Sequence, residues 1–132
     1  MPSIREQLLA IFAADEPEYE RAVALGAAAL PALGKMADDG DPHLAAAAVY
    51  VAGQIPTRDA LEVIARAARR HDPVVRATAA GALRDWAMHP ECADELDAAA
   101  EIVAPLLEDE NATVRRFARD AIDVLPAHHP HA

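Results

Sequence analysis

A short pattern that recurs three times along the chain constrains the fold more than any other feature. Its clearest copy, at residues 72–83, begins with Asp72-Pro73-Val74-Val75-Arg76. An earlier copy begins at Asp41, 31 residues before, and a later copy begins at Asn111, 39 residues after. A unit that repeats at this period is typical of a stacked array, in which each helical pair buries its apolar face only against its neighbours. The repetition therefore predicts a helical solenoid.

Each copy has the features of a helix start. Asp41, Asp72 and Asn111 are good N-cap residues, and in the first two copies a proline follows at the first helical position, where its missing N–H costs nothing. Apolar residues then recur at steps of three and four, the spacing of a helix with one buried face. The equivalent positions of the three copies predict a shared core layer: Leu44, Ala48, Val51, Ala52 and Ile55; Val75, Ala79, Ala82, Leu83 and Trp86; Val114, Ala118, Ala121, Ile122 and Leu125.

A first helix is expected ahead of each of these second helices, at residues 27–38, 58–70 and 93–108. Short linkers make consecutive helices antiparallel neighbours. The chain is thus predicted to be one all-α domain over residues 1–132, with repeats at 27–56, 57–90 and 91–125. Residues 1–26, with helices expected at 3–13 and after Pro17, form either a divergent first repeat or a cap. Residues 126–132 are expected to be a flexible tail.

Composition supports this class and limits the functions open to the chain. The 132 residues include 34 alanines, the best helix former, and only five aromatic residues. The single cysteine, Cys92, excludes an intrachain disulfide and indicates a reducing compartment. The N-terminus lacks the layout of a secretory signal, and no apolar run is long enough for a membrane span, so a cytoplasmic protein is expected. A net charge of −10 disfavours nucleic acid as a partner.

The repeat also resembles a known family. The last copy and the residues before it read Leu106-Leu107-x-Asp109-x-Asn111-x-x-Val114-Arg115-x-x-Ala118, which looks like a HEAT repeat, and the 31-residue unit resembles the short HEAT-like repeat first named for phycobilin lyases. The resemblance covers about residues 27–125 and extends loosely to the first 26. It implies a right-handed α-solenoid of about four antiparallel helical pairs and a role in binding.

The resemblance further implies a ladder of arginines along the stack, each paired with acidic residues of adjacent turns. Arg76 and Arg115 match the arginine position, with Asp72 or Asp109 as the partners. The copy at 41 departs from the pattern because it has Leu44-Ala45 where Val-Arg is expected. One rung of the ladder is therefore expected to be missing.

The sequence contains no recognisable catalytic motif. Some metal-dependent hydroxylases with a similar fold use His-Glu pairs, yet here no histidine precedes a glutamate, and no phosphate-binding glycine loop or chromophore motif occurs. Cys92 and His89 lie three residues apart but have no third residue to orient them. His128, His129 and His131 lack a fixed fourth ligand. We therefore expect no catalytic residue, cofactor or metal site.

The exposed face of the second helices is the predicted binding surface, since the concave side of HEAT-like arrays is lined by these helices. Small residues, including Ala46, Ala47, Ala77, Thr78 and Gly81, are expected to form its floor. Six larger residues are the candidate partner-binding residues: Tyr50, Arg84, Arg116, Phe117, Arg119 and Asp120. In the competing interpretation, Tyr50 and Phe117 pack between neighbouring helices.

The function predicted from the sequence is a non-enzymatic scaffold that binds a protein or peptide. Two alternatives remain open. One is an accessory subunit of an enzyme system, either lyase-like or associated with a modification. The other is self-association through an uncapped end of the array. The chain is expected to be a monomer or a weak homo-oligomer.

Overall fold

The computed structural model describes residues 2–125, and every regular element in this range is a helix. No strand occurs in it, which confirms the predicted all-α class. The predicted tail and its three histidines lie outside the described residues. The helices, with 3₁₀ segments labelled η, are α1 (Ile4–Ala13), α2 (Tyr19–Val23), η1 (Gly26–Ala29), α3 (Leu30–Asp39), α4 (Pro42–Ala52), α5 (Arg58–Ala67), α6 (Pro73–Ala87), η2 (Pro90–Glu95), α7 (Leu96–Val103), η3 (Ala104–Glu108) and α8 (Ala112–Ile122).

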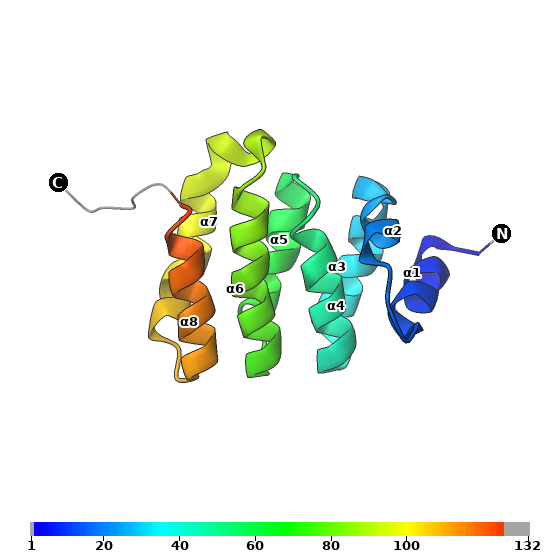
Figure 1. Cartoon of the computed structure of the whole chain (residues 1–132), viewed down its shortest axis with the longest axis horizontal. Coiled ribbons are helices and arrows are strands. Elements are labelled where there is room, and N and C mark those ends of the chain that lie inside the picture. The colour runs from blue at the N-terminus through cyan, green and yellow to red at the C-terminus, as the bar shows by residue number, and fades with distance from the viewer. Residues whose placement is uncertain (1, 126–132) are drawn as a thin grey trace.

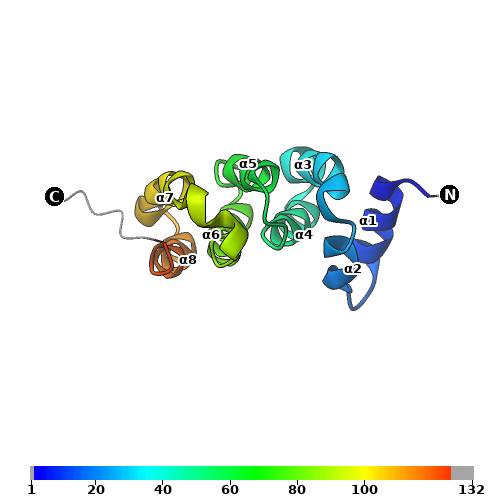
Figure 2. The same ribbon diagram turned by 90° about the horizontal axis from the view of Figure 1, so that it is seen from above.

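The helices stack in two layers, as a solenoid requires. Seen from above, α3, α5 and α7 form one layer, and α4, α6 and α8 form the other (Figure 2). The most extensive contacts between helices are those within the second layer, between α4 and α6 and between α6 and α8. The described chain runs from α1 at one end of the stack to α8 at the other (Figure 1). The predicted solenoid of antiparallel helical pairs is thus confirmed.

Local capping bonds explain where the helices begin. Ser3 and Glu6 form a reciprocal capping box at the start of α1. Asp41 accepts from the N–H of Leu44, and Asp72 accepts from the first turn of α6. Asn111 does the same for α8. The residues that mark the repeats in the sequence therefore each satisfy N–H groups that a helix leaves unpaired.

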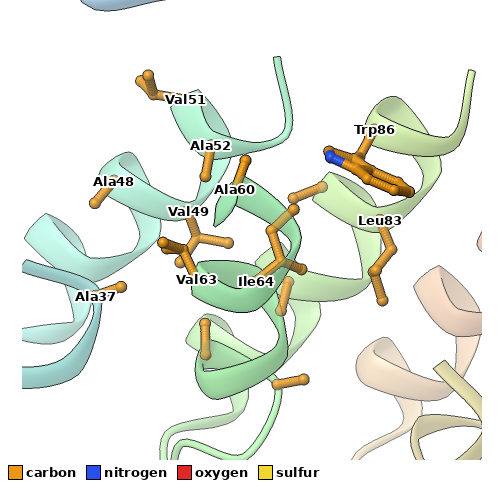
Figure 3. Packing of buried hydrophobic residues seen from close by; sticks show 14 of the residues in the cluster. Ala37, Ala48, Val49, Val51, Ala52, Ala60, Val63, Ile64, Leu83 and Trp86 are labelled. Carbon is orange, nitrogen blue, oxygen red and sulfur yellow. The ribbon is translucent and has the colours of Figure 1, made fainter. Parts of the chain in front are cut away.

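The apolar stripes of the second helices meet the first helices in one continuous core. Figure 3 shows this packing, with Val49 of α4, Ile64 of α5 and Leu83 of α6 in the space between the helices. Trp86 is fully buried, and its indole Nε1–H donates to the carbonyl oxygen of Thr57 at 3.0 Å. Its polar atom is therefore paired within the core, across the α5–α6 pair.

Two helices differ from the sequence prediction. The single helix expected at 93–108 is interrupted, because 3₁₀ turns of η2 and η3 flank the shorter α7. Pro105 lies in η3, where its missing N–H and its ring prevent the α-helix from continuing. At the other end of the array, Gly26 adopts a φ of 66°, a left-handed conformation that separates α2 from η1 and α3. The expected helix after Pro17 is therefore only five residues long.

Candidate partner-binding groove

A groove of about 890 Å³ lies on the face formed by α4, α6 and α8. Helix α6 supplies its floor, while Tyr50 of α4 and Phe117 of α8 stand on either side. Apolar or uncharged residues line the half nearest the start of α6, and charged residues line the half nearest its end. The lining residues are Tyr50, Pro73, Val74, Ala77, Thr78, Gly81, Ala82, Arg84, Asp85, Asn111, Thr113, Phe117, Asp120, Asp123 and Val124.

The depth of the groove follows from the repeat register. Tyr50, Gly81 and Asp120 occupy the same position in the three copies, so the middle helix has no side chain where its two neighbours have large ones. A Cβ placed on Gly81 would have only one contact, with Phe117 Cδ1 at 3.8 Å. Gly81 therefore forms a notch beside Phe117 in the groove that Tyr50 also lines, and a partner's side chain can enter it.

The two aromatic residues both pack against neighbours and face the groove. Tyr50 is 42% exposed, and its ring meets Tyr19 of α2 edge-on at 5.1 Å. Tyr19 in turn lies 6.1 Å from Phe12 of α1, so these rings connect the N-terminal helices to the array. Phe117 is half-buried, and the guanidinium carbon of Arg116 lies 5.5 Å from its ring centre. Both residues therefore pack against neighbouring side chains, as the competing interpretation expects, and both also line the groove.

Three carboxylates and one guanidinium line the groove. Asp85 Oδ2 accepts from Gln54 Nε2 at 2.9 Å, which fixes the side chain at the end of α6. Within residues 2–125, the carboxylates of Asp120 and Asp123 have no hydrogen bond or ion pair. Arg84 is exposed and makes no ion pair with these aspartates in that range. The charged half of the groove thus has a net negative charge, and the carboxylates of Asp120 and Asp123 are exposed at its surface.

Four of the six candidate residues line this groove, namely Tyr50, Arg84, Phe117 and Asp120. Arg116 and Arg119 are exposed on α8 but do not line it. Of the small residues expected in its floor, Ala77, Thr78 and Gly81 line the groove, whereas Ala46 does not and Ala47 is buried. The expectation for Ala47 was wrong because α4 packs against α2 as well as α6, which leaves fewer of its positions exposed.

The acidic end of the groove was not predicted from the sequence. Asp85 and Asp123 both line it, and Val74, which is 59% exposed, lines the opposite end. The available signal was spacing: Asp85 follows Gly81 by four residues, and Asp123 follows Asp120 by three. Extending the exposed face by one helical turn would have included both.

An ion pair joins α6 to the turn that precedes α8. Arg76 Nε and Nη2 donate to the two carboxylate oxygens of Asp109 at 2.8 and 3.1 Å. This hydrogen bond lowers the pKa of Asp109 and raises that of Arg76, although burial opposes both shifts. Arg115 donates to the carbonyl oxygen of Asp109 at 2.7 Å rather than to a carboxylate. Asp72 acts as the N-cap of α6 and has no ion pair in the described range.

The copy at 41 has a different bridge in place of its missing arginine. Ala45 is buried at the position that matches Arg76. At the position that matches Asp109 stands Arg70, which donates back to the carbonyl oxygens of Ala37 and Gly40. At this interface the bridging arginine therefore comes from the following repeat, and its hydrogen bonds join that repeat to the α3–α4 turn.

Comparison with known proteins agrees with this arrangement. The family model described as HEAT repeats matches residues 5–84 and again residues 30–123. The chain belongs to the HEAT-repeat family. The two overlapping matches include α1 and α2 at the N-terminal end of the HEAT array. A search of the curated proteins found no match to the chain.

The remaining reactive groups of the HEAT array lie in its core or are scattered. Cys92 is the buried residue of η2, and burial, with smaller effects from Glu91 and Glu95, raises the pKa of its thiol to about 11. His89 places Nδ1 3.3 Å from the carbonyl oxygen of Trp86. Over residues 2–125, no three His, Cys, Asp or Glu side chains are grouped for metal binding. Within the same range, no helix has the length and apolar character needed to cross a bilayer.

Proposed function

We propose that this HEAT-repeat chain is a non-enzymatic interaction module that holds a segment of a protein partner in the groove over α4, α6 and α8. HEAT repeats generally mediate contacts between proteins. The observation that carries the proposal is the Gly81 notch between Tyr50 and Phe117, because a recess beside aromatic side chains is the form of a binding hot spot. We propose further that the chain acts in the cytoplasm as a monomer or weak homo-oligomer.

A second candidate is an accessory subunit of an enzyme system. The 31-residue spacing of the first two copies favours it, since this spacing resembles the short repeat first named for phycobilin lyases. In this case the groove would bind the enzyme partner or form one wall of its pocket. The two candidates share the same binding surface and differ in the identity of the partner.

Affinity capture from the native extract, followed by mass spectrometry, tests the proposal. The bait carries Phe117→Ala, and a matched control bait carries Leu9→Ala on α1, which removes an exposed apolar side chain outside the groove. We expect the wild type and the control to capture the same partner and the groove variant to lose it.

A second groove variant separates binding from folding, because Phe117 is half-buried. Gly81→Leu fills the notch without removing any packed side chain, since a Cβ there makes only an ordinary contact. Its helicity and Tm should remain at or above those of the wild type, while partner capture is lost. Capture of the same partner by both folded groove variants would place the binding surface elsewhere.

A further inference from the structure

We infer that the segment bound in the groove is basic and amphipathic: an apolar side chain packs over Val74, and a lysine or arginine enters the notch over Gly81. This inference rests on the proposed function and adds the chemistry of the partner. It depends on the division of the groove into an apolar half and an acidic half.

The notch has the shape and surface that a long basic side chain requires. Gly81 contributes no side chain at the notch, Phe117 Cδ1 would lie 3.8 Å from a Cβ there, and the ring of Tyr50 lines the same groove. Lysine and arginine bury their aliphatic stems on apolar surface while the charged group reaches polar atoms. Asp120 stands at the matching position of the next repeat, where its carboxylate can accept from that charged group.

The charge at this end of the groove favours a cation. Asp85 and Asp120 lie in the last turn or so of α6 and α8, and Asp123 is the C-cap of α8. Helices α4, α6 and α8 run in the same direction, so their C-terminal ends share one end of the groove (Figure 1). Carboxylates near helix C-termini are destabilised by the partial negative charge there, and a bound cation relieves this repulsion. Arg84 offsets only one of the three carboxylates.

The other half of the groove lacks charged lining residues. Pro73, Val74, Ala77 and Thr78 form its surface on α6, and Val74 is 59% exposed. Exposed apolar surface of this kind favours an apolar side chain of the partner. An acidic segment, including a second copy of this chain with its net charge of −10, would be repelled at the other end.

A peptide display library is the probe. Peptides are selected on the wild-type chain and counter-selected on Gly81→Leu, so that only those that need the notch remain. We expect them to be enriched in lysine or arginine next to aliphatic or aromatic residues. One selected peptide is then measured by fluorescence anisotropy against the wild type and against Asp120→Asn with Asp123→Asn.

The paired aspartate variant should weaken binding about tenfold, the effect of losing a charge-assisted hydrogen bond. The matched control, Asp15→Asn with Glu16→Gln, removes the same charge from the exposed turn between α1 and α2 and should change binding less than about twofold, because charges beyond a Debye length are screened. Replacing the selected peptide's lysine or arginine by glutamine should reproduce the loss.

The results that would contradict the inferred chemistry differ from those that would contradict the proposed function. Notch-dependent peptides that are acidic or show no charge preference would overturn the inferred chemistry and leave the proposed function intact. Equal weakening by the groove and control variants would likewise refute a specific role for Asp120 and Asp123. Failure to select any notch-dependent peptide would count against both the chemistry and the proposed groove.

Discussion

The ion pair between Arg76 and Asp109 provides the sharpest test of how the repeats are held together. Its two side chains are only 12% and 11% exposed, and two N–O contacts of 2.8 and 3.1 Å join them. Exposed pairs contribute about 0.2–1 kcal/mol, whereas removing one partner of a buried pair costs about 3–5 kcal/mol. For this partly buried, bidentate pair we expect a coupling free energy of about 2 kcal/mol.

The coupling is measured with a double-mutant cycle. Arg76→Ala, Asp109→Ala and the double variant are unfolded in urea at pH 7 and followed by far-UV circular dichroism. The cycle removes the contributions that each side chain makes alone, such as the bonds from Arg76 to the carbonyl oxygens of Arg70 and His71. It also removes the bond from the N–H of Asn111 to Asp109. What remains is the interaction between the two charged groups.

A second pair in the same array is the control. Arg58 and Glu95 are joined by a single contact of 3.4 Å, and their side chains are 56% and 35% exposed. The same cycle on this pair should give less than about 0.5 kcal/mol, because solvent screens an exposed pair. A coupling below about 0.5 kcal/mol for Arg76 and Asp109, or equal values for the two pairs, would refute the reasoning.

The pH dependence of the coupling is an independent check on its sign. The hydrogen bonds from Arg76 hold the folded-state pKa of Asp109 below its ordinary value. A carboxylate whose pKa is lowered on folding contributes its full stabilisation above the unfolded-state pKa of about 4 and loses it as the pH falls through the folded value. The coupling should therefore be constant near neutral pH and decline below about pH 4. An increase with acidification would contradict the assignment.

Three further predictions concern packing. Gly53→Ala should lower the free energy of unfolding by about 1–3 kcal/mol, because its Cβ would lie 2.9 Å from the carbonyl oxygen of Ala82, whereas Gly81→Ala should raise it by about 0.5–1 kcal/mol. Urea unfolding that ranks these variants in the reverse order would contradict the α4–α6 packing. Trp86→Ala should cost about 3–5 kcal/mol, and a loss below about 1 kcal/mol in the same assay would show that Trp86 is not core. Cys92 should react with a thiol reagent at pH 8 only after urea unfolding, since its raised pKa of about 11 leaves little thiolate; rapid labelling of the folded chain would refute its burial.

The helix starts and the core stripes could be predicted because they depend on local chemistry. Asp41, Asp72 and Asn111 cap the helices that follow them, and this bond needs only the residue itself and the next turn. Trp86 was placed in the core by spacing alone, since helical periodicity fixes which residues share a face. The break in the helix expected at 93–108 could also have been predicted, because Pro105 cannot continue an α-helix.

The groove could be predicted only in part. The sequence shows that Tyr50, Gly81 and Asp120 occupy equivalent positions of the three copies. The depth of the notch, however, depends on how closely α4, α6 and α8 approach one another. The burial of Ala47 is likewise set by neighbouring helices rather than by its own helix. Arg70 takes over the missing bridge through contacts with Ala37 and Gly40, thirty or more residues away, which no local pattern reveals.

An NMR titration of the isotopically labelled chain with a notch-selected peptide tests the central claim most directly. The claim is that the face of α4, α6 and α8 binds a protein segment. Amide signals of Thr78, Gly81 and Asp120 should shift the most, and signals of the smaller pocket near Arg58 and Ile102, between α5 and α7, should stay unchanged. Shifts confined to that second pocket, with Gly81 unaffected, would contradict the claim.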